Sequence, residues 1–149
     1  MNARPGDDPF DLQRFLDAQA GIFETALAEL SRGRKASHWM WFVFPQLAAL
    51  GRSGTARRYG LSGLPEATAY LDHPVLGARL IRAAGVVAGL DAGSAHQVFG
   101  SPDDLKFRSC MTLFAAARPD EPVFAANLGR YYGGEPDPLT LALLGGSPA

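Results

Sequence analysis

The sequence predicts a mostly α-helical protein, folded as a single compact domain of many short helices. Apolar residues recur at intervals of three and four along most of the chain, which is the spacing of one face of an α-helix. Capping residues, prolines and glycines divide this pattern into short pieces. Strand-like alternation is confined to the tail of an aromatic run at residues 37–46. We therefore expect one helical domain over residues 10–145, preceded by a flexible N-terminus at 1–9 and followed by a tail at 146–149.

Length and composition limit the kinds of protein that this chain can be. With 149 residues, the chain is long enough to bury a core as one domain. Its net charge of −1 favours neither extended nucleic-acid binding nor attraction to an anionic membrane. One cysteine, Cys110, excludes an internal disulfide and fits a reducing compartment. Because no segment reads as a signal peptide or a membrane helix, the sequence predicts a cytoplasmic protein.

The first helical segment covers residues 12–30. Gly21 interrupts its apolar pattern, which indicates a kink or a junction between two helices. Asp8 or Asp11 can cap the first helix, because a carboxylate there accepts hydrogen bonds from free backbone N–H groups. Gly33 supplies the expected stop.

Short helices are predicted along the rest of the chain as well. The expected pieces are one turn at 47–50, short helices at 55–59 and 64–71, a longer helix at 75–90, one turn at 94–99, a helix at 101–117, and two more that begin at 120–122 and 137–138. Three glycines, Gly77, Gly85 and Gly89, lie inside the longer helix. Each lowers helix propensity by about 1 kcal/mol relative to alanine, so we expect close packing at these positions.

Residues 37–46 form the most unusual stretch, Ser-His-Trp-Met-Trp-Phe-Val-Phe-Pro-Gln, which holds both tryptophans of the chain. Such a run is either the central plug of the core or an aromatic wall of a binding cleft. Together with the preceding Arg34 and Lys35, it could stack one base and neutralise one phosphate. We expect Met40, Phe42 and Phe44 to face mainly the core and His38, Trp39, Trp41 and Gln46 to lie nearer a ligand, a division that alternation matches only in part.

The helix predicted from Ser101 carries a second group of candidate residues. Ser101 is the expected cap, followed by Pro102 at the first helical position. Asp103, Lys106 and Ser109 share or adjoin one face by their spacing. Lys106 could bind an anionic ligand, act as an amine nucleophile, or simply form an intrahelical salt bridge with Asp103.

Metal and cofactor motifs are not found. His38, His73 and His96 lie far apart in the sequence, and none pairs closely with another histidine or with Cys110. Neither a phosphate-binding glycine loop nor a nucleophile elbow follows a predicted strand. The sequence therefore predicts no metal site and no cofactor.

The chain resembles the bacterial DUF1810 family, sometimes labelled calpastatin-like, over nearly its whole length. The motifs that carry the resemblance are residues 37–46, Gly51 with Ser53 and Tyr59, Tyr70-Leu71 with His73-Pro74, Leu76-Gly77 with Arg79-Leu80, residues 99–106 and 109–114, and Gly133-Gly134 with Asp137 and Thr140. The family name implies no activity. The calpastatin label implies protease inhibition, which none of these residues supports.

A more distant resemblance, carried by the helix with Lys106 and Phe107, is to the YbiA-like or NADAR group. It implies hydrolysis of an N-glycosidic bond in a nucleotide or ADP-ribose-like compound, with a lysine that forms an imine with the opened sugar. Lys106 is the one residue carried over, and Asp103 or His38 could move protons. The expected ligand-binding residues are Arg34, Trp39, Trp41, Gln46, Tyr59 and Ser109. The alternative is a noncatalytic helical module that binds a nucleotide-like ligand or a protein partner.

Overall fold

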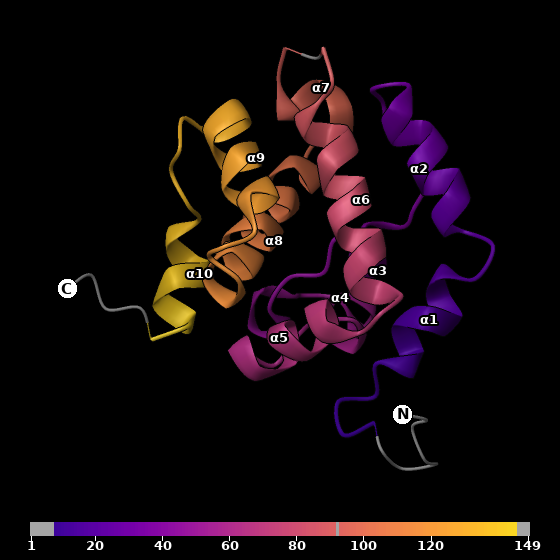
Figure 1. The fold of residues 1–149 in the computed structure, drawn as a ribbon, viewed down its shortest axis with the longest axis vertical. Helices are drawn as coiled ribbons and strands as arrows, with labels where there is room; N and C mark the ends of the chain where they lie inside the picture. Colours follow the sequence, from indigo (N-terminus) through magenta and orange to yellow (C-terminus); the bar gives the residue numbers. More distant parts are fainter. Residues whose placement is uncertain (1–7, 92, 146–149) are drawn as a thin grey trace.

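Ten α-helices and one 3₁₀ helix follow one another along the described residues, 8–91 and 93–145, of this computed structural model (Figure 1). Their bounds are α1 Gln13–Gln19, α2 Phe23–Ser31, α3 Met40–Val43, η1 Ala48–Leu50, α4 Gly54–Arg58, α5 Leu64–Asp72, α6 Leu76–Ala88, α7 Ala95–Phe99, α8 Asp103–Ala117, α9 Pro122–Tyr132 and α10 Pro138–Leu143. Over the same residues, extended backbone pairs at one isolated parallel bridge, between Leu47 and Leu61. The predicted mostly α-helical class is confirmed.

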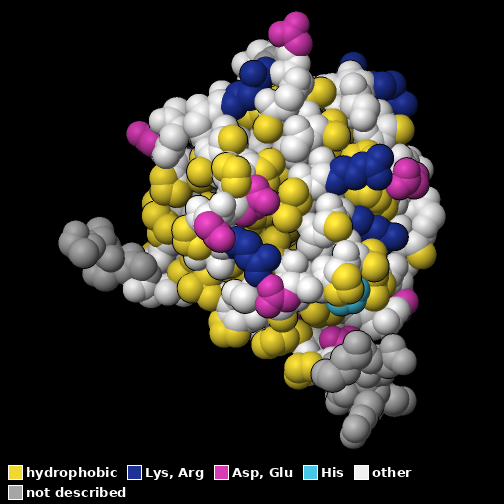
Figure 2. Space-filling model, viewed as in Figure 1, with side chains coloured by type: hydrophobic (Ala, Val, Ile, Leu, Met, Phe, Trp, Pro, Cys, Tyr) yellow, Lys and Arg dark blue, Asp and Glu magenta, His cyan; other side chains and the backbone are white. Residues whose placement is uncertain are grey.

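Helix α8 lies at the centre of the packing. It contacts α5, α7, α9 and α10, while α6 packs against α2, α5 and α9. Figure 1 shows α9 and α10 on one flank and α1 and α2 on the other, with α6 between them. Most of the middle of α8 is buried, including Phe107, Cys110 and Phe114. In Figure 2, hydrophobic side chains gather over α8, α9 and α10, whereas Lys and Arg are more frequent over α6 and α2.

The predicted helix boundaries are largely confirmed. Gly21, with a φ of 72°, separates α1 from α2. The carboxylate of Asp8 accepts hydrogen bonds from the N–H groups of Leu12 and Gln13, so Asp8 rather than Asp11 serves as the cap. Residues 1–7 of the predicted N-terminal segment and the 146–149 tail lie outside the described residues. None of the described helices is both long and apolar enough to cross a membrane.

Two local predictions are wrong. Ser101 does not cap α8: the helix begins at Asp103, so the cap position is Pro102, and no side chain accepts a hydrogen bond there. The alternating burial expected along the aromatic run also fails, since Met40–Val43 forms a short helix, α3. A helical turn buries positions that are three and four residues apart. The buried set is therefore Trp39, Met40, Val43 and Phe44, and Phe42 is only half-buried.

Candidate functional site

The aromatic stretch is fixed at its start by the buried carboxylate of Glu29 on α2. This carboxylate accepts hydrogen bonds from the N–H groups of Ala36 at 2.8 Å and Ser37 at 3.0 Å, from the Ser37 hydroxyl at 2.5 Å, and from the Trp39 indole at 2.9 Å. Burial alone would raise the pKa of Glu29, but these bonds to its charged form lower the pKa to about 2. Trp39 is fully buried and its N–H is already used. The expectation that Trp39 contacts a ligand is therefore corrected: it is a core residue.

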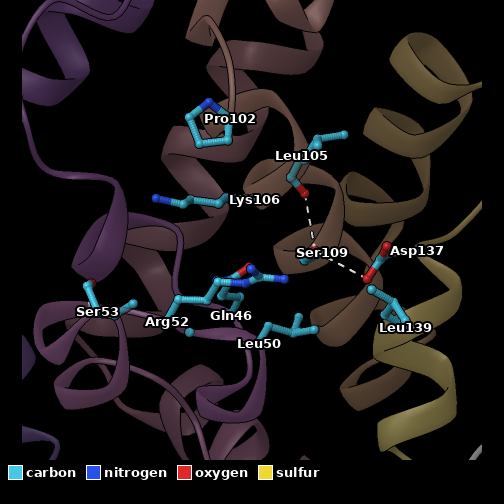
Figure 3. A pocket seen from close by; sticks show the side chains of 12 residues that line it. Gln46, Leu50, Arg52, Ser53, Pro102, Leu105, Lys106, Ser109, Asp137 and Leu139 are labelled. Atoms are coloured by element: carbon cyan, nitrogen blue, oxygen red, sulfur yellow. Dashed lines mark hydrogen bonds between the residues drawn. The ribbon is translucent and has the colours of Figure 1, made fainter.

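A cleft of about 600 Å³ lies beyond this core, between the η1–α4 segment and helices α8 and α10 (Figure 3). We call it the α8 cleft. Its lining residues are Gln46, Leu50, Gly51, Arg52, Ser53, Ala56, Pro102, Leu105, Lys106, Ser109, Asp137 and Leu139. Three of them, Gln46, Lys106 and Ser109, are residues that the sequence predicted for a site. Its volume lies in the range typical of small-molecule sites.

Lys106 joins the α8 cleft to a narrower cavity. The Nζ atom of Lys106 lies 5.3 Å from the centroid of the Trp41 ring, an arrangement that stabilises the ammonium by a cation–π interaction. Trp41, Tyr59 and Gln46 line this second cavity together with Lys106. Its volume is only about 10 Å³, which is room for roughly one water molecule. Trp41 and Tyr59 therefore adjoin the site without offering an open stacking surface.

The carboxylate of Asp103 is shared by two lysines. The Nζ of Lys35 lies 2.8 Å from Oδ2, and the Nζ of Lys106 lies 3.5 Å from Oδ1. The Lys35 side chain is 8% exposed, and its Nζ also lies 5.2 Å from the Trp39 ring centroid. Asp103 thus acts first as counter-ion to a nearly buried lysine, and its contact with Lys106 is the longer one.

Several polar groups in the α8 cleft have no partner among the described residues. The guanidinium of Arg52 and the side-chain amide of Gln46 make no hydrogen bond there, nor does Oδ1 of Asp137. Asp137 Oδ2, in contrast, accepts from the hydroxyls of Ser109 at 3.2 Å and Thr140 at 2.6 Å. Figure 3 shows Arg52 reaching from the Ser53 side of the cavity toward Ser109 and Asp137. The cleft therefore offers two cations and an amide donor to a ligand.

Two predicted residues lie elsewhere. Arg34 is exposed and lines a separate, shallow cavity of about 410 Å³ with Lys35 and His96. His38 is exposed and lines neither the α8 cleft nor the narrow cavity beside Trp41. The expectation that His38 and Arg34 share a site with Lys106 is corrected, because neither residue lines a cavity that Lys106 lines.

Other cleft residues were missed by the sequence reasoning. Arg52 lies in the loop between η1 and α4, and no local pattern distinguishes it from the other arginines. The sequence indicates Asp137 only as the start of a helix and as part of a family motif; it does cap α10, by accepting from the N–H of Thr140 at 3.0 Å. Over the described part of the chain, no group of three or more His, Cys, Asp or Glu side chains is arranged to hold a metal ion.

Comparisons with known proteins agree with this fold. A family model described as "Protein of unknown function (DUF1810)" matches residues 9–144. The crystal structure of the conserved hypothetical protein Rv1873 from Mycobacterium tuberculosis is similar, with a TM-score of 0.91 and 53% sequence identity. The match covers 93% of this chain and 99% of that chain. The search of curated proteins gave no match. Neither description names a ligand or an activity.

Proposed function

The chain belongs to the DUF1810 family, and we propose that it binds a small nucleotide-like anion in the α8 cleft. One observation carries the proposal: Arg52 and Gln46 line a cavity of about 600 Å³ beside Lys106, with no hydrogen-bond partner for either side chain among the described residues. Arg52 is an exposed residue, so its unpaired guanidinium lies at the rim of the cavity, where it can hold a phosphate with two parallel N–H···O bonds.

The charges around the cleft favour an anion. Arg52 and Lys106 contribute two positive charges, and Asp137 contributes one negative charge. Asp103 adds little to the balance, because Lys35 holds it at 2.8 Å. The local surplus is therefore about one positive charge, enough to select for a phosphate-bearing ligand over a neutral one.

The remaining polar groups suit the hydroxyl-bearing part of a nucleotide. Oδ1 of Asp137 can accept a hydrogen bond from a sugar hydroxyl, since the bonds of this carboxylate to Ser109 and Thr140 all use Oδ2. The Gln46 amide can both donate and accept. In this proposal, Arg52 and Lys106 hold the phosphate, while Asp137 and Gln46 orient the sugar.

Calorimetric titration with AMP and ADP-ribose tests this function. Arg52→Ala should weaken binding by about tenfold, since a charge-assisted hydrogen bond is lost. Arg82→Ala is a matched control, because Arg82 is exposed on α6 and does not line the cleft. The proposal is refuted if the wild-type protein binds neither compound at millimolar concentration. It is also refuted if Arg52→Ala and Arg82→Ala lose the same amount of affinity.

A second candidate function, which we infer from the distant resemblance to the YbiA-like or NADAR group noted in the sequence and from none of the comparisons, is hydrolysis of an N-glycosidic bond. The observation that favours it is the position of Lys106, whose side chain lines the cleft, while Asp103 lies closer to Lys35 than to Lys106. The C1–O4 bond of the sugar would open first, with its electron pair and a proton going to O4, which leaves C1 double-bonded to the base nitrogen. Lys106, after releasing a proton to solvent, would then add its lone pair to C1. The bond from C1 to the base nitrogen breaks, and the base leaves with a proton. Water then adds to the resulting lysine imine, which releases the sugar aldehyde and restores the amine.

Lys106→Arg separates this reaction from simple binding. The substitution keeps the positive charge but removes the nucleophile. Catalysis through Lys106 predicts that Lys106→Arg still binds AMP while losing turnover of ADP-ribosylated compounds, and that borohydride traps a covalent adduct on the wild type only. Equal turnover by both proteins would eliminate the imine mechanism and leave the binding function untouched.

A further inference from the structure

The two most exposed large hydrophobic side chains in the described part of the chain line the same cleft. Leu105 on α8 is 59% exposed and Leu139 on α10 is 65% exposed. Leu50, at the end of η1, lines the cleft beside them. Figure 3 shows Leu50 and Leu139 near one another at one end of the cavity, with Lys106 at the other end. Leu105 lies apart from these two, beyond Ser109 and Asp137, so the cleft has exposed leucines on two of its sides. Exposed leucines in a concave, partly polar site are unusual, because burying them would be favourable.

We infer that these leucines, Leu50, Leu105 and Leu139, form an aliphatic wall that receives the planar base of the bound nucleotide. The inference rests on the proposed function, which supplies the anion-binding end of the site. A ligand would then lie along the α8 cleft between Lys106 and Leu139, with the Arg52 side chain reaching in between them. Such a site, largely apolar with a few convergent polar groups, is the usual form of a small-molecule pocket.

The aromatic residues are less suited to the base than the sequence suggested. The cavity beside Trp41 and Tyr59 has a volume of about 10 Å³, too small for a nucleobase. The face of Trp41 is also occupied by the ammonium of Lys106, 5.3 Å from the ring centroid. The base therefore belongs at the aliphatic wall, and the aromatic side chains hold Lys106 in place.

A second copy of the chain is a poorer occupant of this wall. Arg52, Gln46 and Oδ1 of Asp137 lie in the same cleft without partners among the described residues. A protein surface that covered the leucines would also have to desolvate these groups and provide partners for each of them. A nucleotide satisfies both requirements with one molecule, since it joins an apolar ring to a hydroxylated sugar and a phosphate.

The wall also predicts a weak preference among bases. Leucine side chains carry no hydrogen-bond groups, so they cannot read the donor and acceptor pattern of a base edge. Adenine and guanine nucleotides should therefore bind with similar affinity, while removal of the base should weaken binding.

The test compares AMP with ribose 5-phosphate, by calorimetry, on wild type, Leu139→Ala and Leu143→Ala. Leu143 is the matched control, since it is 49% exposed on the same helix but does not line the cleft. Leu139→Ala should weaken AMP binding by about fivefold through lost apolar contact and leave ribose 5-phosphate binding unchanged. Leu143→Ala should change neither affinity, and circular dichroism checks that both variants are folded.

Each other outcome overturns the inference in a distinct way. Equal affinity of the wild type for AMP and ribose 5-phosphate would remove the base subsite while leaving the proposed anion binding intact. Binding of neither compound would refute the proposed function together with the inference. A wild-type dimer that Leu139→Ala, but not Leu143→Ala, dissociates in analytical ultracentrifugation would assign the leucines to a contact between copies.

Discussion

The Nζ atom of Lys35 lies 2.8 Å from Oδ2 of Asp103, which joins the loop before α3 to the first turn of α8. The two side chains are 8% and 18% exposed, so this ion pair is largely withdrawn from solvent. Lys106 approaches the same carboxylate at 3.5 Å. Asp103 therefore connects the buried aromatic stretch, through Lys35 and Trp39, to the lysine of the α8 cleft.

Asp103→Asn should destabilise the protein by about 2 kcal/mol, because it leaves Lys35 as a nearly buried cation without its counter-ion. Urea unfolding measures this loss. Asp104→Asn is the neighbouring control: Asp104 contacts His96 at 3.5 Å, and the His96 side chain is 68% exposed. A surface pair of this kind contributes less than about 1 kcal/mol. If both variants lose the same free energy of unfolding, the contact between Asp103 and Lys35 contributes no stability of its own.

Glu29 predicts a specific dependence of stability on pH. Its pKa is about 2 in the folded protein, below the ordinary value of 4.5 that applies to the unfolded chain. As the pH falls, the unfolded chain binds the proton first, so the stabilisation is complete above pH 4.5 and is lost between pH 4.5 and 2. Glu29→Gln should remove a contribution on the order of 2 kcal/mol at neutral pH and flatten the acid limb of the stability curve.

The control for Glu29 lies on the same helix. Glu24 is exposed on α2, so Glu24→Gln should show the same loss of stability at acid pH as the wild type. Unfolding free energies from urea titrations at several pH values between 5 and 2 distinguish the two variants. An unchanged acid limb in Glu29→Gln would show that the hydrogen bonds from Ser37 and Trp39 do not hold the charged carboxylate.

The sequence predicted the fold well because helix ends have local chemistry. Ser53, Ser94 and Asp137 accept hydrogen bonds from the N–H groups three residues later, as their positions before apolar runs indicated. The helix Met40–Val43 was missed because four residues are too few to show a period. That omission assigned Trp39 to a ligand when its indole is committed to Glu29.

The candidate site was only partly predictable. The spacing along one helix indicates Lys106 and Ser109, and the end of the aromatic run indicates Gln46; all three line the α8 cleft. Arg52 and Leu139 have no distinguishing neighbours in the sequence. They become notable only when the η1–α4 loop and α10 meet at α8, a tertiary arrangement that no local pattern encodes.

Two glycines of α6 should respond to alanine with opposite signs. A Cβ atom on Gly77 would lie 2.0 Å from the backbone oxygen of Leu71, so Gly77→Ala forces α5 and α6 apart and should cost about 2 kcal/mol. A Cβ atom on Gly85 meets nothing within 4 Å, so Gly85→Ala should stabilise the helix by about 0.5 to 1 kcal/mol. Urea unfolding of both variants shows whether each substitution raises or lowers the free energy of unfolding. A destabilised Gly85→Ala would contradict the open space around that glycine.

Trp41 should report ligand binding through its fluorescence. Its ring faces the Lys106 ammonium at 5.3 Å, and an anion that draws this ammonium into the α8 cleft changes the electric field at the indole. Adding AMP should therefore change the emission of the wild type and leave that of Trp41→Phe unchanged, because the remaining Trp39 is fully buried. Free N-acetyltryptophanamide corrects for light absorbed by the nucleotide.

The calorimetric affinity of Trp41→Phe completes this test. Because Trp41 lies outside the lining of the α8 cleft, Trp41→Phe should bind AMP within about twofold of the wild type while losing the optical signal. Lys106→Met should lose both the signal and part of the affinity, since it removes the cation that couples the ring to the ligand. A signal that survives in Lys106→Met would place the nucleotide directly against Trp41, and the base would then stack on the aromatic residues rather than on the leucines.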